Sequence, residues 1–162
     1  MKTQIYDNNT SNNRTEYEKR ILLSFSKNLN STFRFGFVYF KRIVFDSDYA
    51  NILLIERGND EKVIGGLTFK TIPEKRVVSL EYLYIEKLYQ RRGLGRHLVN
   101  QLEKQIKRQN RKIEAIMLRS SNDSVNFYTK CGYVTDQSLL SVTESKELLG
   151  WCYEGTLMAF NL

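Results

Sequence analysis

The chain has 162 residues and a mass of 19.1 kDa, which is the size of one compact domain. One proline and nine glycines exclude collagen-like and proline-rich classes of protein. Two cysteines are too few for a disulfide framework or a zinc cluster. No stretch approaches the ~18 apolar residues of a membrane span. Lys and Arg number 25 against 18 Asp and Glu, so the net charge of +7 favours an anionic partner without choosing among nucleic acid, an acidic membrane face and a phosphorylated ligand.

The first half of the chain predicts a helix followed by strands. A short strand at residues 5–6 precedes a polar stretch, and apolar residues then recur at helical spacing over 14–29. Aromatic and β-branched residues fill 33–45, and this local pattern predicts a strand. Apolar runs over 51–57 and 62–70 flank a Gly-Asn-Asp turn, which indicates a β-hairpin.

The second half alternates strands and helices. An alternating run over 76–85 places Ser79 and Glu81 on one face of a strand. An amphipathic helix begins near Gly93, and a further helix, with Asn122 as its N-cap, is stopped by Gly132. More strands are expected at 113–118, 133–134 and 156–160. Because no internal repeat is found, the order of elements predicts one α/β domain over residues 1–162.

The most distinctive segment joins the strand at 76–85 to the amphipathic helix and reads Gln90-Arg91-Arg92-Gly93-Leu94-Gly95-Arg96. Glycines there let the backbone approach a ligand closely, and the open amides at a helix N-terminus bind phosphate. The segment is no Walker loop, since no Gly-Lys-Ser/Thr ends it, and it lacks the third glycine of a dinucleotide fingerprint. An ordinary basic turn is the alternative, but a strand before, a helix after and arginines between favour a phosphate site.

This segment is similar to the Gln/Arg-x-x-Gly-x-Gly unit of the GNAT acetyltransferase superfamily, which holds the pyrophosphate of acetyl-coenzyme A. Residues 121–134 resemble the superfamily's helix and strand downstream of that unit. The chain also resembles the nuclear histone acetyltransferases of the SAGA/PCAF type in four segments, 42–46, 62–69, 93–98 and 153–158. The resemblance implies the GNAT fold, an α/β (α+β) arrangement with a central mixed, mostly antiparallel sheet flanked by helices. It also implies that residues 33–45 are partly helical, against their local pattern.

The same resemblance implies a lysine N-acetyltransferase that uses acetyl-coenzyme A as donor, needs no metal and transfers the acetyl group directly in a ternary complex. The implied partners are a histone tail or another lysine-bearing protein and the subunits of an adaptor complex, in the nucleus or alternatively in the cytoplasm. No membrane partner is expected. We also expect no bromodomain in this chain, which is a departure from the family. Two other functions stay open. One is a GNAT enzyme for another amine, such as a polyamine or a protein N-terminus, and the other is a catalytically weak scaffold that binds coenzyme A.

A candidate general base lies on the strand at 76–85. Counted back from Gly93, the family's base glutamate falls on Ser79, and Glu81 lies two residues on, on the same strand face. A free lysine has a pKa near ~10.4, so transfer at neutral pH needs a group that removes its proton. A carboxylate in a dry cleft can do so directly or through a water, and Glu81 is the candidate. The alternatives are a solvent-facing Glu81 and a water held by Ser79.

Other roles are implied by the resemblance. The backbone of Leu83, Tyr84 and Ile85 would pair with the pantetheine arm, and one of their amides would polarise the thioester carbonyl. Tyr128 stands where many members carry the acid that protonates the departing thiolate, with core packing as the alternative. Asn122 could contact coenzyme A, although capping its helix is the simpler role.

A run of cations follows the amphipathic helix, namely Lys104, Lys107, Arg108, Arg111 and Lys112. Such a run at a helix end is more often a solvated face that suits the helix dipole than a direct contact to DNA. His97 is a lone histidine inside the helix, and we expect a structural role for it.

Overall fold

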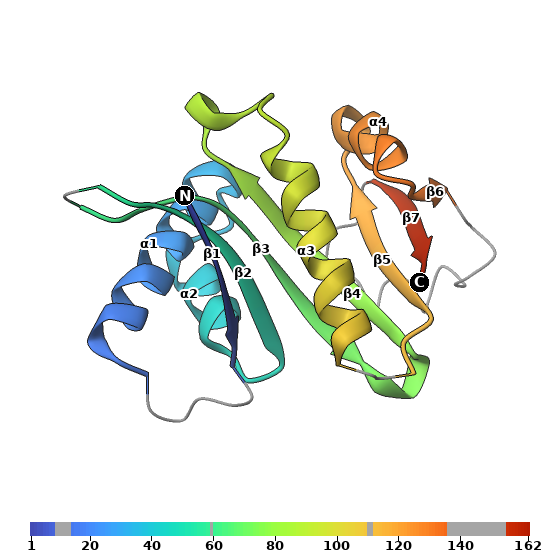
Figure 1. Cartoon of the computed structure of the whole chain (residues 1–162), viewed down its shortest axis with the longest axis horizontal. Coiled ribbons are helices and arrows are strands. Elements are labelled where there is room, and N and C mark those ends of the chain that lie inside the picture. The colour runs from blue at the N-terminus through green and yellow to red at the C-terminus, as the bar shows by residue number, and fades with distance from the viewer. Residues whose placement is uncertain (9–13, 59, 110–111, 136–154) are drawn as a thin grey trace. The chain divides into compact units, whose positions relative to one another are not determined.

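Figure 1 shows the fold as a computed structural model, which describes residues 1–8, 14–58, 60–109, 112–135 and 155–162. The chain divides into two compact units. The first consists of Met1–Phe69 and Tyr82–Leu102, and the second of Lys70–Glu81 and Glu103–Leu162. Among the described residues, no helix combines the length and the apolar character needed to cross a membrane.

Seven strands are hydrogen-bonded neighbours in the order β1-β2-β3-β4-β5-β7-β6 (Figure 1). Their bounds are β1 Lys2–Asp7, β2 Tyr49–Glu56, β3 Lys62–Ile72, β4 Val77–Ile85, β5 Ala115–Ser120, β6 Val134–Thr135 and β7 Thr156–Asn161. β1 pairs with β2 antiparallel, as do β5 with β7 and β6 with β7, whereas β4 and β5 run parallel with Val77 opposite Ala115. The predicted mixed, mostly antiparallel sheet is therefore confirmed, together with the strands predicted for β2, β3 and β4.

Helix α1, Glu16–Phe33, belongs to the first unit. It starts with a capping box, in which the Glu18 amide donates to the Thr15 hydroxyl at 3.2 Å and the Thr15 amide donates to a Glu18 carboxylate oxygen at 2.9 Å. Leu22, Phe25 and Leu29 are fully buried and share a core with residues of β2 and β3. The helix predicted over 14–29 is confirmed.

Helix α2, Phe37–Phe45, occupies the segment whose local pattern predicts a strand. That prediction is wrong, and the helix implied by the family resemblance is confirmed. Phe40, Ile43 and Val44 are buried at helical spacing, and the Phe40 ring centroid lies 5.2 Å from that of Tyr82. The strand propensity of these residues is outweighed because only a helix puts all three side chains into the core of this unit.

Two glycines of β3 permit the closest packing in the first unit. A Cβ on Gly66 would lie 2.6 Å from Leu53 Cδ2 and 2.8 Å from Phe25 Cε2, closer than carbon atoms approach. A Cβ on Gly65 would meet Ile85 Cδ1 at 2.7 Å. Helix α1 and the end of β4 thus pack directly against bare backbone of β3.

The second unit holds α4, Asn122–Lys130, beside β5 and β7. Its N-cap is Ser121, so the prediction that Asn122 caps this helix is wrong: Ser121 already has the extended backbone of a cap, and Asn122 is the first helical residue. Gly132 has a φ of +93° and ends α4 as predicted, because that conformation favours glycine. Tyr133 follows and is buried, with its ring centroid 5.4 Å from that of Phe160.

Candidate active site

The carboxylate of Glu81 lies on β4 and is mostly buried. Only 12% of its side chain is exposed, and Ser79 on the same strand face is 1% exposed. The Ser79 hydroxyl donates a hydrogen bond to Glu81 Oε1 at 2.7 Å, and the Lys70 ammonium on β3 lies 3.9 Å from the same oxygen. Glu81 is therefore a carboxylate held by two neighbours, and the alternative of a solvent-facing side chain does not describe it.

The surroundings of Glu81 act on its pKa in opposite directions. Burial raises the pKa above its ordinary value near 4.5, because removal from water disfavours the charged form. The hydrogen bond from Ser79 and the charge of Lys70 favour the carboxylate and lower the pKa. A carboxylate whose pKa is raised holds an abstracted proton more firmly than an exposed one, which suits a general base.

Lys70 is the member of this cluster that the sequence analysis missed. It lies on β3 and Glu81 lies on β4, so the pairing of two strands brings them together rather than a spacing along one element. The sequence does contain one indication that Lys70 lies near Glu81, namely the turn at Pro73–Lys75, a 3₁₀ turn that joins the two strands. Counting outward from this turn as in a hairpin pairs Ile72 with Val77 and puts Lys70 opposite Ser79, one same-face position from Glu81.

The end of β4 carries the three residues expected to bind the pantetheine arm. Leu83, Tyr84 and Ile85 are half-buried. The Ile85 carbonyl accepts a hydrogen bond from Gln90 Nε2 at 3.0 Å, and the next amide, that of Glu86, donates to the β3 backbone at 2.8 Å. Gln90 thus ties the loop back to β4 by this contact, and its role in cofactor binding stays a prediction.

Helix α3 comprises Leu94–Arg108. The loop that joins β4 to this helix leaves space beside its backbone. Arg91 and Gly93 have positive φ angles of 61° and 77°, and a Cβ on Gly93 would meet nothing within 4 Å. A helical hydrogen bond of α3 runs from the His97 amide to the Gly93 carbonyl at 3.0 Å, so the amides before His97 lie at the N-terminus of the helix. Arg91, Arg92 and Arg96 are exposed around them. This arrangement has the amides and the positive charge that a phosphate group requires.

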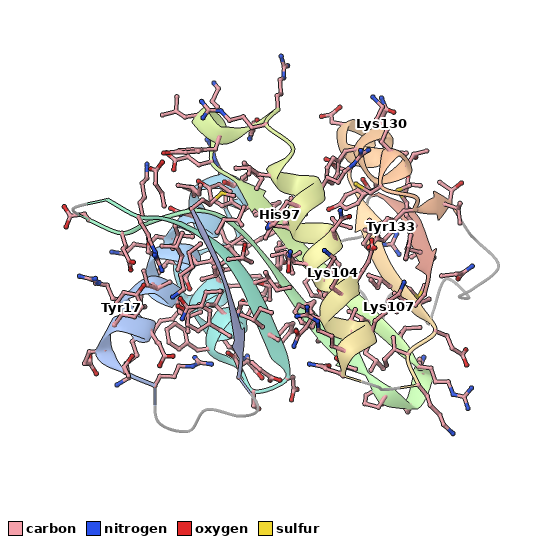
Figure 2. All side chains as sticks on the ribbon, in the orientation of Figure 1. Tyr17, His97, Lys104, Lys107, Lys130 and Tyr133 are labelled. Atoms are coloured by element: carbon pink, nitrogen blue, oxygen red, sulfur yellow. The ribbon has the colours of Figure 1, made fainter. Side chains whose placement is uncertain are left out.

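Two contacts hold this loop in place. The Arg92 guanidinium lies 5.4 Å from the centroid of the Tyr89 ring, and the Tyr89 hydroxyl donates to Glu56 on β2. His97, labelled on α3 in Figure 2, contacts Thr3 Oγ1 on β1 through Nε2 at 3.0 Å. The structural role expected for His97 agrees with this contact.

Tyr128 and Asn122 both lie on α4 in the second unit. Tyr128 is 8% exposed, and its ring centroid lies 4.9 Å from that of Phe127 and 5.7 Å from that of Tyr133, which Figure 2 labels. Burial raises the pKa of the Tyr128 hydroxyl well above its ordinary value, so the group stays protonated at neutral pH. Asn122 is exposed. Tyr128 is thus a protonated core residue, and its role as an acid stays a prediction.

Several other predicted features can be placed. Lys104, Lys107 (both labelled in Figure 2), Arg108 and Lys112 are exposed around the C-terminal end of α3. Arg111, Cys152 and the start of the segment 153–158 lie outside the described residues. In the described ranges, no group of three or more His, Cys, Asp or Glu side chains could hold a metal ion.

Residues 20–133 match the family described as "Acetyltransferase (GNAT) family". The chain belongs to the GNAT acetyltransferase family. The histone acetyltransferase GCN5 of Yarrowia lipolytica is 24% identical over 101 residues, which are 62% of this chain and 21% of that protein. The chain therefore spans about a fifth of the length of this relative.

Solved GNAT structures share the fold. Tetrahymena GCN5 has a TM-score of 0.79 at 21% identity, with 99% of this chain and 96% of that chain covered. An aminoglycoside 6′-N-acetyltransferase complexed with coenzyme A has a TM-score of 0.69 at 18% identity, with coverage of 99% and 97%. Arabidopsis thaliana NAA60 with a bisubstrate analogue has the same TM-score at 14% identity, with 99% of each chain covered.

The expected family and fold are thus confirmed. Acetyl-coenzyme A is the acetyl donor of GNAT enzymes, and coenzyme A is present in the aminoglycoside acetyltransferase structure and in a second structure of Tetrahymena GCN5. The loop at the start of α3 fits this donor, because the space beside Gly93 is empty and the arginines of the loop are exposed at a helix N-terminus.

Proposed function

We propose that this GNAT domain, formed by residues 1–162, acetylates lysine side chains with acetyl-coenzyme A as donor, and that histone tails are its acceptors. The observation that carries the proposal is the buried carboxylate of Glu81, held by Ser79 on the strand face where the family's base stands. The residues assigned to the donor follow directly along the same strand and the loop after it.

The donor is held by backbone and arginines. The amides of residues 94–96 bind the pyrophosphate, with positive charge from Arg91, Arg92 and Arg96. Gly93 leaves the backbone accessible, since nothing occupies the place of its absent side chain. The backbone of Leu83, Tyr84 and Ile85 binds the pantetheine arm as an added strand.

Transfer then needs one base and one acid. Glu81 accepts a proton from the lysine ammonium, and the free amine attacks the carbonyl carbon of the thioester. A backbone amide at the end of β4 donates to the oxyanion that forms. As the C–S bond breaks, Tyr128 gives its proton to the thiolate, and the nitrogen of the new amide loses its second proton to solvent. Acetyl-lysine and coenzyme A leave, and solvent restores both side chains to their starting protonation states.

Histone acceptors and a nuclear location are supported by the likeness to GCN5 proteins, at low identity. A second candidate is an amine other than lysine, because an aminoglycoside acetyltransferase also shares the fold, and the net charge of +7 slows encounter with a basic tail. The third hypothesis, a scaffold without catalysis, lacks support from the site, since a carboxylate with a raised pKa is present.

The test is incubation of the chain with labelled acetyl-coenzyme A and a panel of histones, polyamines, aminoglycosides and N-terminal peptides. Label on histone lysines that disappears with Glu81→Gln supports the proposal. Label on another amine alone would mean that this amine, and not a histone lysine, is the acceptor, while the proposed roles of base and acid would stand. Tight coenzyme A binding without transfer to any amine would favour the scaffold.

A further inference from the structure

The first unit exposes large apolar side chains where α1 meets α2. Val38 is 80% exposed, Phe35 57% and Tyr39 44%. The Phe35 and Tyr39 rings lie edge to face with centroids 5.9 Å apart, and Val38 precedes Tyr39 on the first turn of α2. A single exposed hydrophobic side chain is ordinary, whereas several adjoining ones indicate an interaction surface.

Cations adjoin these side chains. Arg34, Lys41 and Arg42 are exposed, and none of them forms an ion pair with another residue that the structure describes. The stretch 24–45 contains four Lys and Arg and no Asp or Glu, so the local charge is strongly positive. Cations are common in the last turn of a helix, so positive charge alone would not indicate a binding surface. Here the cations lie beside exposed apolar side chains, and the combination does indicate one. We call these six residues, Arg34, Phe35, Val38, Tyr39, Lys41 and Arg42, the α1–α2 patch.

The backbone under the α1–α2 patch is held in one conformation. Asn30 accepts two hydrogen bonds of 3.0 Å, from the Arg34 amide to its carbonyl and from the Gly36 amide to its Oδ1. Arg34 has a φ of +59°, a conformation that non-glycine residues adopt less readily and that the surrounding hydrogen bonds hold here. The Tyr39 hydroxyl is hydrogen-bonded to the Tyr82 hydroxyl at 2.9 Å. A surface fixed in this way loses little conformational entropy on binding.

We propose that the α1–α2 patch is a docking site for an acidic segment of a partner protein that carries a large aliphatic or aromatic side chain. An apolar centre with arginine and lysine around it is the usual anatomy of a protein interface. Phe35 and Val38 would bury the partner's apolar side chain, while the cations would pair with its carboxylates. The most exposed member is aliphatic, which favours a protein over single-stranded nucleic acid, whose bases stack on aromatic rings. A basic histone tail does not fit, because like charges repel.

The test does not depend on acetyl transfer. Random peptides displayed on phage are selected on the whole chain and then measured on the double variant Val38→Ser/Lys41→Glu. The matched control is Leu88→Ser/Lys87→Glu, because Leu88 is 73% exposed beside an exposed lysine elsewhere in the first unit. Selected peptides that bind the patch variant at least ~10-fold more weakly than the control should be acidic and carry a large apolar residue. Their affinity should fall with added salt.

Several results would overturn the proposal. The proposal is wrong if the peptides that depend on the α1–α2 patch are neutral or basic, or if the control variant weakens their binding equally. It is also wrong if no selected peptide depends on the patch. Tighter binding of an oligothymidylate that the patch variant loses would assign the surface to nucleic acid instead. A wild-type dimer that the patch variant splits, seen by light scattering, would show that a second copy covers this surface. Thermal melts of all variants establish that they are folded.

Discussion

Ser79 donates a hydrogen bond to Glu81 Oε1 at 2.7 Å, so a buried hydroxyl holds a carboxylate two positions along the same strand face. Only 12% of the Glu81 side chain is exposed, and Lys70 lies 3.9 Å from the same oxygen. We therefore expect Ser79, the position where the family's base is expected, to position the carboxylate of Glu81.

Replacing Glu81 by Gln should lower kcat/KM at pH 7 by about two to four decades, the range expected when a general base is lost. The deficit should shrink above about pH 9, because the free amine becomes abundant without a base. Steady-state rates across this pH range measure both effects. Glu103→Gln is the control, since burial also raises the pKa of Glu103. A wild-type rate that does not change with pH would contradict the assignment.

The same substitution should stabilise the fold at neutral pH. Burial raises the pKa of Glu81 in the folded chain, so the folded state binds its proton more tightly than the unfolded state. The stabilisation from this group is complete below the unfolded pKa of ~4.3 and is lost as the pH rises through the folded pKa. Glutamine carries no charge and avoids that loss. Urea unfolding should show Glu81→Gln more stable than wild type at pH 7, with the difference shrinking toward pH 4. Equal stability at pH 7 would mean that Ser79 and Lys70 fully offset burial.

Replacing Ser79 by Ala should change the pH profile rather than the maximum rate. The lost hydrogen bond favoured the carboxylate, so the pKa of Glu81 rises and the acidic limb of kcat/KM moves to higher pH. Ser79→Thr, which keeps the hydroxyl, should restore the wild-type profile. Ser26→Ala is the matched control, because Ser26 is also buried and donates to the Leu22 carbonyl. A drop of equal size at every pH would indicate a purely structural role for Ser79.

Replacing both Gly93 and Gly95 by Val should abolish coenzyme A binding measured by calorimetry. The φ of +77° at Gly93 is strongly disfavoured for a β-branched residue, and the new side chain would fill the space through which phosphate reaches the backbone. Gly36→Val is the control, since Gly36 also has a positive φ with open space around it but lies outside the loop. Unchanged affinity in the double variant would exclude the phosphate site.

Replacing Tyr128 by Phe should lower kcat by roughly 10–100-fold with little change in coenzyme A affinity, if its proton goes to the leaving thiolate. Tyr133→Phe is the control, because it removes the same hydroxyl from the neighbouring ring. The Tyr133 hydroxyl is buried without a hydrogen-bond partner among the described residues, so its removal should leave kcat and stability near wild type. Equal turnover in the two variants would assign Tyr128 to packing.

The local signals of the chain predicted correctly wherever they were strong. The apolar spacing of α1, the glycines at the start of α3 and Gly132 after α4 each act through neighbouring residues, and the structure has these elements where they were expected. Asn122 was misplaced as an N-cap by one residue, because Ser121 beside it can adopt the same extended backbone.

The sequence by itself determined the family and the order of elements apart from α2, since both depend on spacings of a few residues, and it predicts the phosphate site before α3. Only the tertiary structure decided that α2 is a helix, because the Phe40 ring packs against Tyr82 of β4, which lies far away in the chain. It also decided the state of Glu81. Alternation puts Ser79 and Glu81 on one face, but burial and the approach of Lys70 from β3 come from strand pairing, which no local pattern contains.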